Sequence, residues 1–441
     1  MERLLVVLEG EVAGEITPDG DGMRFAYVGD RSSSTPLSLS LPPRPEPYPD
    51  DRIRAWVRGL LPDDGDTLQR WGRRVDLVGA ATPERILGTP IGWDCAGAVQ
   101  FCTPAALETM LQRPRHVAPV GDGEIAAALR DAIADAGGQR SSGSGSAPCY
   151  SLAGGQPKIA LALTAAGWQS PTGAAPSTHI LKPPPSEAAA EQPVNEHLCL
   201  ATARRLGLNA AVSALAVFDD IPVVVVERYD RAPGLAGPVR VHQEDAAQAL
   251  GRPPDTRAEA LQGVSTVDIA DLLRSADAPH EDVWAVVDRL ALAWALGLID
   301  GHGKNTSLLL AENQVRLAPL YDIATMLPYT TGGEDIYLAM HVGDEPTLAL
   351  IGRDHWETHA HRLQLPVGDV LQRVARIATA TADAATEAAA DCAEHAAAGT
   401  LPARFADAAA AWRVHCLDAL TTAPSARPQA PGRGLGITCL A

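Results

Sequence analysis

Runs of apolar residues predict several β-strands in the middle of the chain. The longest run begins at residue 221, stays apolar through Val226 and then turns polar, which is typical of a strand buried on both faces. A short apolar run that precedes a polar turn at 312–314 and a second run at 315–317 predicts a hairpin. The strands expected from these and similar runs lie at 159–163, 178–182, 221–229 and 307–310.

Apolar residues spaced by three or four positions predict helices, which are sparse in the first half of the chain and dense in the second. One helix is expected to begin near Val194 and to end before Gly207. Helices dominate from about residue 243 to 422, including 283–298 and the alanine-rich stretch 370–396. The start of the chain predicts a small α/β region, with strands near 3–8 and 24–28 and a helix near 50–60.

Changes of composition divide the chain into five expected segments. The Gly/Ser-rich stretch 137–148 has the composition of a flexible linker, and the Pro/Gly-rich end that of a disordered tail. The predicted fold class is mixed α/β (α+β), a two-lobed body preceded by a small α/β subdomain. The expected segments are 1–112 (N-terminal subdomain), 113–148 (connector), 149–230 (strand-rich N-lobe), 231–422 (helical C-lobe) and 423–441 (tail).

Three polar residues around the predicted hairpin have a spacing that suits phosphoryl transfer. Asp300 precedes Asn305 by five positions, and Asp322 follows the hairpin. The first spacing matches the catalytic Asp and Asn of protein kinases. There a carboxylate takes the proton of the acceptor hydroxyl, while an Asn and a second Asp hold Mg²⁺ on the nucleotide. The hairpin would return Asp322 to the side of Asn305. The alternative is a polar turn before a surface hairpin.

A small-residue loop and a lysine offer two contacts for nucleotide phosphates. The glycine pair of the loop 151–158 lets backbone N–H groups approach phosphate oxygens. Lys182, at the end of a predicted strand, has the place of a kinase phosphate-binding lysine. Asn195 or Glu196 can orient this lysine, and Glu196 is the better ion partner. Each feature alone is weak, because a plain hairpin turn and a solvated lysine would explain them as well.

These features occur in the order in which protein kinases carry them, and the end of the buried strand, 227–229, takes the place of the kinase hinge. With several longer motifs they resemble the HipA-type serine/threonine kinases, toxins of bacterial type II toxin–antitoxin systems. The resemblance covers roughly residues 1–375. It rests on SLAGGQPK (151–158), ILKP (180–183), VNE (194–196), VERYDR (226–231), HQED (242–245), DGHGKN (300–305) and APLYD (318–322), with N-terminal motifs at 54–63 and 94–99.

The resemblance implies a two-lobed, protein-kinase-like fold that binds ATP and Mg²⁺ between the lobes. It implies that Asp300 is the catalytic base, that Asn305 and Asp322 are the metal ligands, and that Lys182 contacts the ATP phosphates. Ser151 falls on the autophosphorylated serine of the family. The other residues expected at the nucleotide are Ala153, Gly154, Gly155, Gln156, Pro157 and Lys158 of the phosphate loop, Glu227, Arg228 and Tyr229 of the hinge, and His302 and Tyr321.

Some positions near the catalytic motif leave alternatives open. Lys304 is expected to place a positive charge near the transferred phosphoryl group. His302 either supports its loop through a hydrogen bond or contacts phosphate. The segment 242–245 either takes part in catalysis or, as favoured here, caps a helix and braces the catalytic loop. Gly303 and Thr306 stand where relatives often carry other residues.

The composition limits the class of partner. The 441 residues have a formal net charge of −18 and a pI near 5.0, which argues against direct binding of DNA through the general surface. The seven cysteines include no CxxC pair, so neither a disulfide framework nor a zinc site is expected. No apolar run approaches the ~20 residues of a membrane span, and the first strand is too short for a signal peptide. We therefore expect a cytoplasmic protein that does not bind membranes.

Two kinds of partner follow from the resemblance. The neutralising partner would be a HipB-like helix-turn-helix antitoxin, through which DNA is contacted indirectly. The protein substrate would be an aminoacyl-tRNA synthetase. Two other functions stay open: a kinase of the same fold with a different acceptor, because phosphotransfer motifs do not specify the acceptor, and a co-repressor module that joins an antitoxin on operator DNA.

Overall fold

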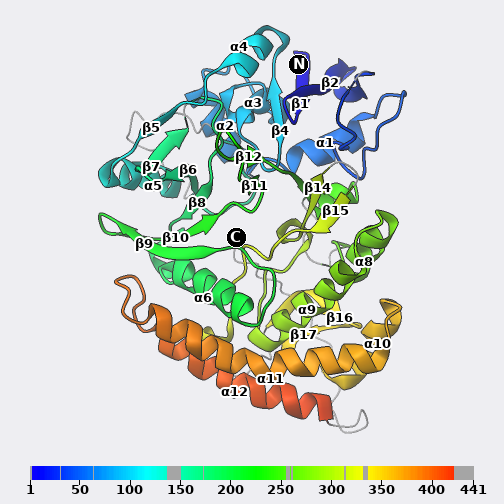
Figure 1. Cartoon of the computed structure of the whole chain (residues 1–441), viewed down its shortest axis with the longest axis vertical. Coiled ribbons are helices and arrows are strands. Elements are labelled where there is room, and N and C mark those ends of the chain that lie inside the picture. The colour runs from blue at the N-terminus through cyan, green and yellow to red at the C-terminus, as the bar shows by residue number, and fades with distance from the viewer. Residues whose placement is uncertain are drawn as a thin grey trace.

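Three groups of elements follow one another along the longest axis of the molecule, with the N-terminal group at the top of Figure 1 and the last helices at the bottom. The computed structural model describes residues 2–29, 31–62, 64–136, 150–171, 173–254, 259, 262–311, 314–330 and 336–421. The expected linker 137–148 and tail 423–441 lie outside the described residues. Among the described helices, none combines the length and the apolar character that a membrane crossing requires.

The N-terminal subdomain is an antiparallel sheet covered by short helices. Its elements are β1 (Leu4–Leu8), β2 (Glu11–Asp19), β3 (Gly22–Tyr27), β4 (Val99–Cys102), α1 (Asp50–Arg58), α2 (Gly65–Arg74), α3 (Pro83–Leu87) and α4 (Leu107–Gln112). The strand order is β3-β2-β1-β4. All of β1 is buried, because alternate residues point to opposite faces: Val6 packs with Trp56 of α1, and Val7 with Met110 of α4. The strands and the helix predicted here are confirmed.

The middle group, which we call the N-lobe, is a six-stranded antiparallel sheet with a helix on each face. Its elements are β5 (Val117–Pro119), β6 (Ile159–Thr164), β7 (Gly167–Pro171), β8 (His179–Lys182), β9 (Ser213–Phe218), β10 (Ile221–Glu227), α5 (Asp122–Ala136) and α6 (Gln192–Arg205), and the strand order is β5-β7-β6-β8-β10-β9. In β10, Val223 packs in the core that α5 covers, and Val224 in the core that holds α6. Because both faces are covered, this strand is a continuous apolar run, as predicted.

Part of the expected connector belongs to this sheet. β5 pairs with β7, and α5 contributes Ile125 and Leu129 to the core beneath the strands. The sequence pattern missed both elements, because a three-residue edge strand has no detectable period and the alanine-rich face of α5 contrasts little with its surroundings. We propose that the N-lobe begins near Val117.

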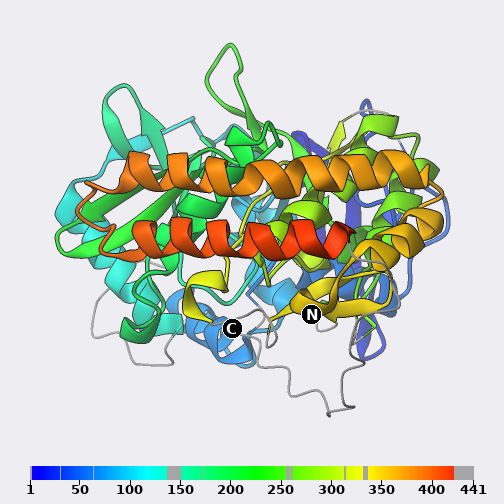
Figure 2. The same cartoon turned by 90° about the horizontal axis from the view of Figure 1, so that it is seen from below.

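The third group, the C-lobe, is mostly helical and also holds short strands. Its helices are α7 (Ala246–Ala249), α8 (Thr266–Ser275), α9 (His280–Leu296), α10 (Arg353–Arg362), α11 (Val367–Cys392) and α12 (Leu401–Thr421). Its strands are β13 (His242–Asp245), β14 (Ser307–Ala311), β15 (Gln314–Leu317), β16 (Tyr337–Val342) and β17 (Glu345–Thr347), and the pair β11 (Arg231–Ala232) and β12 (Val239–Arg240) precedes them. The long helices α11 and α12 lie side by side across its base (Figure 2). The predicted hairpin is confirmed as β14–β15.

The end of α9 sets the position of the chain that follows it. Gly297 adopts a left-handed conformation with φ 61°, which favours glycine, and a Cβ there would lie 2.7 Å from Leu327 Cγ. The turn directs the chain into an isolated bridge between Leu298 and Thr325. The DGHGKN motif (300–305) begins two residues after Leu298, so its path is set by this buried helix end.

Candidate active site

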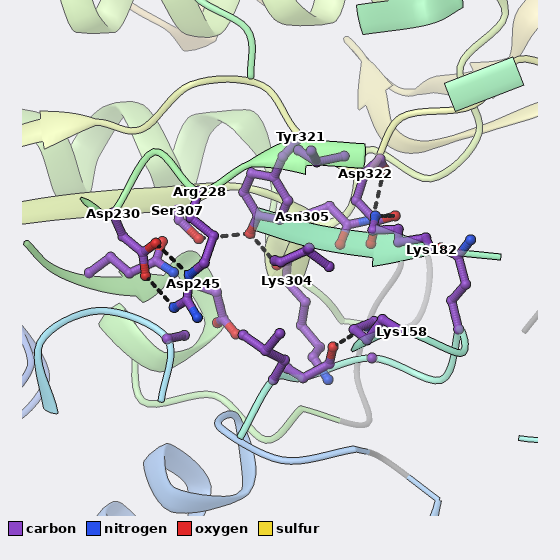
Figure 3. Close-up of a pocket in the computed structure, with 18 of the residues that line it drawn as sticks. Lys158, Lys182, Arg228, Asp230, Asp245, Lys304, Asn305, Ser307, Tyr321 and Asp322 are labelled. Atoms are coloured by element: carbon purple, nitrogen blue, oxygen red, sulfur yellow. Dashed lines mark hydrogen bonds and ion pairs between the residues drawn. The ribbon is translucent and has the colours of Figure 1, made fainter. Parts of the chain in front are cut away.

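One cavity between the two lobes gathers almost all residues that the sequence predicted to act. The residues that were predicted from the sequence and that line this cavity are Ala153, Gly154, Gly155, Gln156, Lys158, Lys182, Glu227, Arg228, Tyr229, Asp300, His302, Lys304, Asn305, Tyr321 and Asp322. Pro157 is not among them and faces a second cavity behind the phosphate loop. Ser151 lines neither cavity, because it is fully buried. The close-up in Figure 3 shows several of these side chains converging from different elements.

The phosphate loop runs from Leu152 to Lys158 and leads directly into β6. Gly154 has φ 94°, a conformation that L side chains rarely adopt, and a Cβ there would lie 3.0 Å from Lys158 Nζ. The Lys158 ammonium closes the loop by donating to the Ala153 carbonyl over 2.5 Å. Burial lowers the pKa of Lys158 to about 8. The loop therefore places a lysine and several small residues along one wall of the cavity.

Lys182 forms the centre of a buried ion cluster. From the end of β8 its Nζ contacts Glu196 Oε1 of α6 at 2.8 Å. The same Nζ contacts Asp322 Oδ1 at 2.7 Å (Figure 3). Burial disfavours the ammonium form, but the two carboxylates outweigh it and raise the pKa of Lys182 above its usual range. The prediction that Glu196 orients Lys182 is confirmed, whereas Asn195 points elsewhere.

Asp322 combines an unusual backbone conformation with a strongly acidic side chain. Its φ is 54°, in the left-handed region, which costs free energy for a residue other than glycine and is found preferentially at functional sites. Desolvation opposes its ionisation, but Lys182 and Lys158 outweigh this effect and lower the pKa of Asp322 to about 2. Asp322 is therefore a carboxylate at neutral pH, with 30% of its side chain exposed toward the cleft.

The catalytic motif forms a tight loop that ends in a single turn of 3₁₀ helix, Gly303–Asn305. Asn305 Nδ2 donates to the Asp300 carbonyl at 2.8 Å and to the Asp322 carbonyl at 3.3 Å. One amide thus joins the two acids through their backbones, as the hairpin was expected to allow, and leaves its Oδ1 for another partner. The Asp300 side chain is 47% exposed, with His302 Nε2 at 3.5 Å from its Oδ1.

Two tyrosines brace this loop from the side of the hinge. The Tyr321 hydroxyl donates to the Lys304 carbonyl at 2.7 Å and lies 2.7 Å from Ser307 Oγ (Figure 3). The Tyr321 ring packs against that of Tyr229, with 5.5 Å between ring centroids. Lys304 itself is buried and lines the cavity. Tyr321, which was predicted as a nucleotide contact, holds the loop 300–305 in place through this hydroxyl.

Arg228 has a structural role that the sequence did not indicate. Its guanidinium contacts Asp230 Oδ1 at 3.0 Å, Ser177 Oγ at 2.8 Å and the Cys95 carbonyl at 2.9 Å, and its N–H donates to the Thr178 carbonyl. These bonds engage the Arg228 side chain and its backbone N–H, and the Arg228 carbonyl accepts the Arg231 N–H at 3.3 Å.

The Arg228 contacts belong to a larger buried network that sequence reasoning missed. Asp94 of the N-terminal subdomain accepts hydrogen bonds from Arg231 at 2.9 Å and from Arg240 at 2.9 Å. Burial disfavours the Asp94 carboxylate, but the arginines, Arg231 first, outweigh it and hold its pKa well below the usual range. Such a network spans residues up to 146 positions apart. The charged VERYDR motif and the motif at 94–99, which contains Asp94, were the local signals for it.

Ser151 is anchored to the N-terminal subdomain. Its Oγ donates to the Leu60 carbonyl at 2.6 Å, its N–H donates to the Asp94 carbonyl at 2.9 Å, and it forms a parallel bridge with Cys95. Its exposed fraction is 0%. A kinase can phosphorylate Ser151 only after this segment leaves the position seen here.

The segment 242–245 forms β13 and then caps a helix. Asp245 accepts the backbone N–H of Gln248 in a reciprocal capping box at the start of α7, so the favoured capping role is confirmed. The Ala246 N–H donates to the Thr306 carbonyl at 2.8 Å, which connects α7 to the end of the catalytic loop. Glu244 accepts the Leu39 N–H at 2.7 Å, and burial raises the pKa of Glu244 to about 8.

Comparison with known proteins places this site in a family. The model of the HipA N-terminal domain matches residues 4–102, and that of the HipA-like C-terminal domain matches residues 150–389, more than half of the chain. The chain belongs to the HipA family of kinases. The second match spans the phosphate loop, the Lys182 cluster and the catalytic loop, so all the predicted site residues fall within the HipA-like C-terminal domain.

Individual relatives of this HipA-family kinase support the same family membership. The "Putative kinase Y4mE" of Sinorhizobium fredii is 33% identical over 393 residues, 85% of this chain and 89% of the relative. The "Serine/threonine-protein kinase toxin HipA" of Shewanella oneidensis is 28% identical over 364 residues, 75% and 76% of the two chains. The solved complex of HipA, HipB and operator DNA from the same species matches with a TM-score of 0.78 at 24% identity, over 94% of this chain and 97% of that one. The predicted mixed α/β, kinase-like fold is confirmed.

The donor set of the HipA-family site fits a magnesium ion shared with nucleotide phosphates. Among the residues that the structure describes, no group of three or more His, Cys, Asp or Glu side chains is placed to hold a metal on its own. Magnesium usually takes one or two protein carboxylates and completes its shell with substrate phosphates and water. The ionised Asp322 and the Oδ1 of Asn305 are two hard oxygen donors of this kind at the cleft.

Proposed function

We propose that this HipA-family kinase transfers the γ-phosphoryl group of Mg²⁺-bound ATP to a serine or threonine hydroxyl of another protein. The observation that carries the proposal is the convergence of Lys182, Asp322, Asn305 and Asp300 on one cavity between the lobes. These residues come from three separate segments of the chain, because Asp300 and Asn305 belong to one loop. Their shared arrangement has the donors and acceptors that phosphoryl transfer requires.

The phosphate groups would be held by three lysines on two walls of the cavity. Lys182 and Lys158 line the N-lobe wall of the cavity, and Lys304 lines the wall of the catalytic loop. Backbone N–H groups of the glycine-rich loop can approach phosphate oxygens without a Cβ in the way. Fixed charges that face the transferred group stabilise the charge that develops there, because they need no reorganisation during the reaction.

Asp300 would act as the base for the acceptor hydroxyl. Its carboxylate is 47% exposed, so a side chain of another protein can reach it, while its backbone is held by Asn305. The carboxylate accepts the hydroxyl proton as the hydroxyl oxygen bonds to the γ-phosphorus, while the bond from that phosphorus to the β–γ bridging oxygen breaks and ADP leaves. Asn305 and Asp322 would hold the Mg²⁺ ion, which, when bound, neutralises part of the phosphate charge.

The test of this proposal is a transfer assay with the purified full-length protein. With radiolabelled ATP and Mg²⁺, we expect label on protein in a cell extract, and on serine or threonine when the labelled protein is hydrolysed. Transfer of the label to a small molecule, with none on protein, would show that the acceptor is not a protein. If the purified protein transfers no label, with or without extract, the result would favour the alternative function of a binding module.

The biological partners that we propose follow from the family. A HipA of Shewanella oneidensis has been solved with HipB and operator DNA. We infer that this chain is the toxin of a type II toxin–antitoxin system, neutralised by a HipB-like helix-turn-helix protein that carries the DNA contact. The net charge of −18 supports an indirect contact. We propose an aminoacyl-tRNA synthetase as substrate, and phosphoproteomics after induced expression would identify it.

Phosphorylation of Ser151 is expected to switch the enzyme off. A phosphate adds about −1.5 to −2 charges, and the buried space around the Ser151 Oγ, with the Leu60 carbonyl at 2.6 Å, cannot hold it. The segment and the phosphate loop that follows it would therefore leave the cleft, and ATP binding would be lost. Mass spectrometry should find this phosphate in the wild type and not in Asp300→Asn, and the phosphorylated fraction should not bind ATP.

Two results would contradict the role of Ser151. One is phosphate confined to Ser144 or Ser146, which lie outside the described residues. The other is a Ser151 phosphoform that binds ATP like the unmodified protein. The variant Ser151→Ala serves as the control: it should bind ATP normally, because it removes a single hydrogen bond and adds no charge.

A further inference from the structure

Two adjacent residues of α6 face two different parts of the active site. Glu196 contacts Lys182 of the N-lobe, whereas Asn195 contacts Thr325 of the C-lobe. Neighbouring positions on an α-helix point about 100° apart, so one helix can serve both lobes. Both side chains are buried, with exposed fractions of 4% for Asn195 and 2% for Glu196. The sequence suggested only that one of them orients Lys182.

The contact between Asn195 and Thr325 uses both ends of one amide. Asn195 Nδ2 donates to the Thr325 carbonyl at 2.9 Å, and the Thr325 N–H donates to Asn195 Oδ1 at 2.9 Å. Cys199 Sγ lies 3.4 Å from the same Oδ1. Only a primary amide offers a donor and an acceptor in this geometry, because a carboxylate lacks the donor and an apolar side chain lacks both.

Thr325 also connects the segment that contains Asp322 with the segment that contains Asp300. It lies three residues after Asp322 and forms an isolated bridge with Leu298, two residues before Asp300. The Thr325 hydroxyl donates to the Leu296 carbonyl at the end of α9. A single buried residue, 1% exposed, therefore fixes the segment of Asp322 against the segment of Asp300.

We propose that Asn195 is a positioning residue that aligns Asp322 and Asp300 with the Lys182–Glu196 pair, an inference that rests on the proposed kinase function. Asp322 has φ 54°, a conformation that persists only where surrounding contacts hold it. The Asn195–Thr325 contact is such a restraint, and it originates from the helix that also holds Lys182. Asn195 is not among the residues that line the cavity, so its effect passes through the position of Asp322.

The experiment compares Asn195→Asp with the wild type. The aspartate keeps the shape of the side chain and the bond from the Thr325 N–H, but it cannot donate to the Thr325 carbonyl. We expect the Mg²⁺ concentration for half-maximal transfer to rise and kcat to fall, each by about tenfold or more, because a buried acceptor loses its donor. Nucleotide affinity in EDTA should stay at the wild-type value, because the Lys182 cluster and the phosphate loop are intact.

A matched control and a second measurement separate positioning from a general loss of folding. Thr202→Val changes another buried polar side chain of α6, whose hydroxyl donates to the Leu198 carbonyl of the same helix, and should leave the Mg²⁺ dependence unchanged. In Asn195→Leu, the Thr325 N–H loses its acceptor, so hydrogen exchange of the peptide that contains Thr325 should accelerate. This measurement uses the protein without nucleotide and does not depend on its activity.

The outcomes distinguish this inference from the proposed function. If the wild type shows neither Mg²⁺-dependent nucleotide binding nor transfer, the kinase proposal fails, and the hydrogen exchange still tests the link between α6 and Thr325. If the wild type is active and Asn195→Asp has the wild-type Mg²⁺ dependence and kcat, Asn195 is not a positioning residue. An equal loss of nucleotide affinity in EDTA and in Mg²⁺ would likewise overturn the inference.

Discussion

Replacing Asp300 with asparagine is expected to reduce phosphoryl transfer by about 10²–10⁴-fold, the range that general base catalysis contributes. The amide has the same shape but cannot accept the proton of the acceptor hydroxyl at neutral pH. The Asp300 carbonyl still accepts the Asn305 amide, so the loop should keep its path. ATP affinity should therefore equal that of the wild type, and kcat alone should fall in a steady-state assay.

The control for this variant is Asp51→Asn, which removes a carboxylate from the exposed first turn of α1 and should not change transfer. A purified Asp300→Asn protein that phosphorylates itself or a substrate near the wild-type rate would show that another group takes the proton. A fall in ATP affinity together with a lower thermal midpoint would indicate damage to the loop, and the role of Asp300 as base would lose its support.

Replacing Asp322 with alanine is expected to remove the metal-dependent part of ATP binding. The carboxylate is ionised at neutral pH, because Lys182 and Lys158 hold its pKa at about 2. Changes in the groups that merely support metal ligands commonly cost 10–100-fold in metal affinity, so loss of the ligand itself should lower ATP affinity in Mg²⁺ by at least about tenfold. Affinity measured in EDTA should hardly move. Isothermal titration in both conditions provides the comparison.

Asp322→Asn separates the metal role from the ion cluster. Its amide oxygen can still accept the Lys182 ammonium, whose second partner, Glu196, remains at 2.8 Å. This variant should therefore keep more of the wild-type stability than Asp322→Ala does, while it loses Mg²⁺-dependent affinity. Equal losses of affinity in Mg²⁺ and in EDTA would point to a disturbed N-lobe wall. That result would leave the metal role of Asp322 without support.

The sequence by itself predicted much of the local structure and most of the residues that line the cavity between the lobes. The apolar run of β10 predicted a strand covered on both faces, since the residues of a doubly covered strand are all apolar. The spacing of Asp300, Asn305 and the β14–β15 hairpin brought Asp322 to Asn305, because an antiparallel hairpin returns the chain to its start. Both signals lie within short stretches of sequence, so reading them requires no knowledge of contacts between distant residues.

Only the tertiary structure decided which partner each side chain finds. The sequence placed Asn195 and Glu196 side by side, but the docking of α6 between the lobes determined that one reaches Thr325 and the other Lys182. The anchoring of Ser151 by Leu60 and the network around Asp94 likewise join residues far apart in the chain. Such contacts follow from how separately formed elements pack, and hydrophobic periodicity carries no information about them.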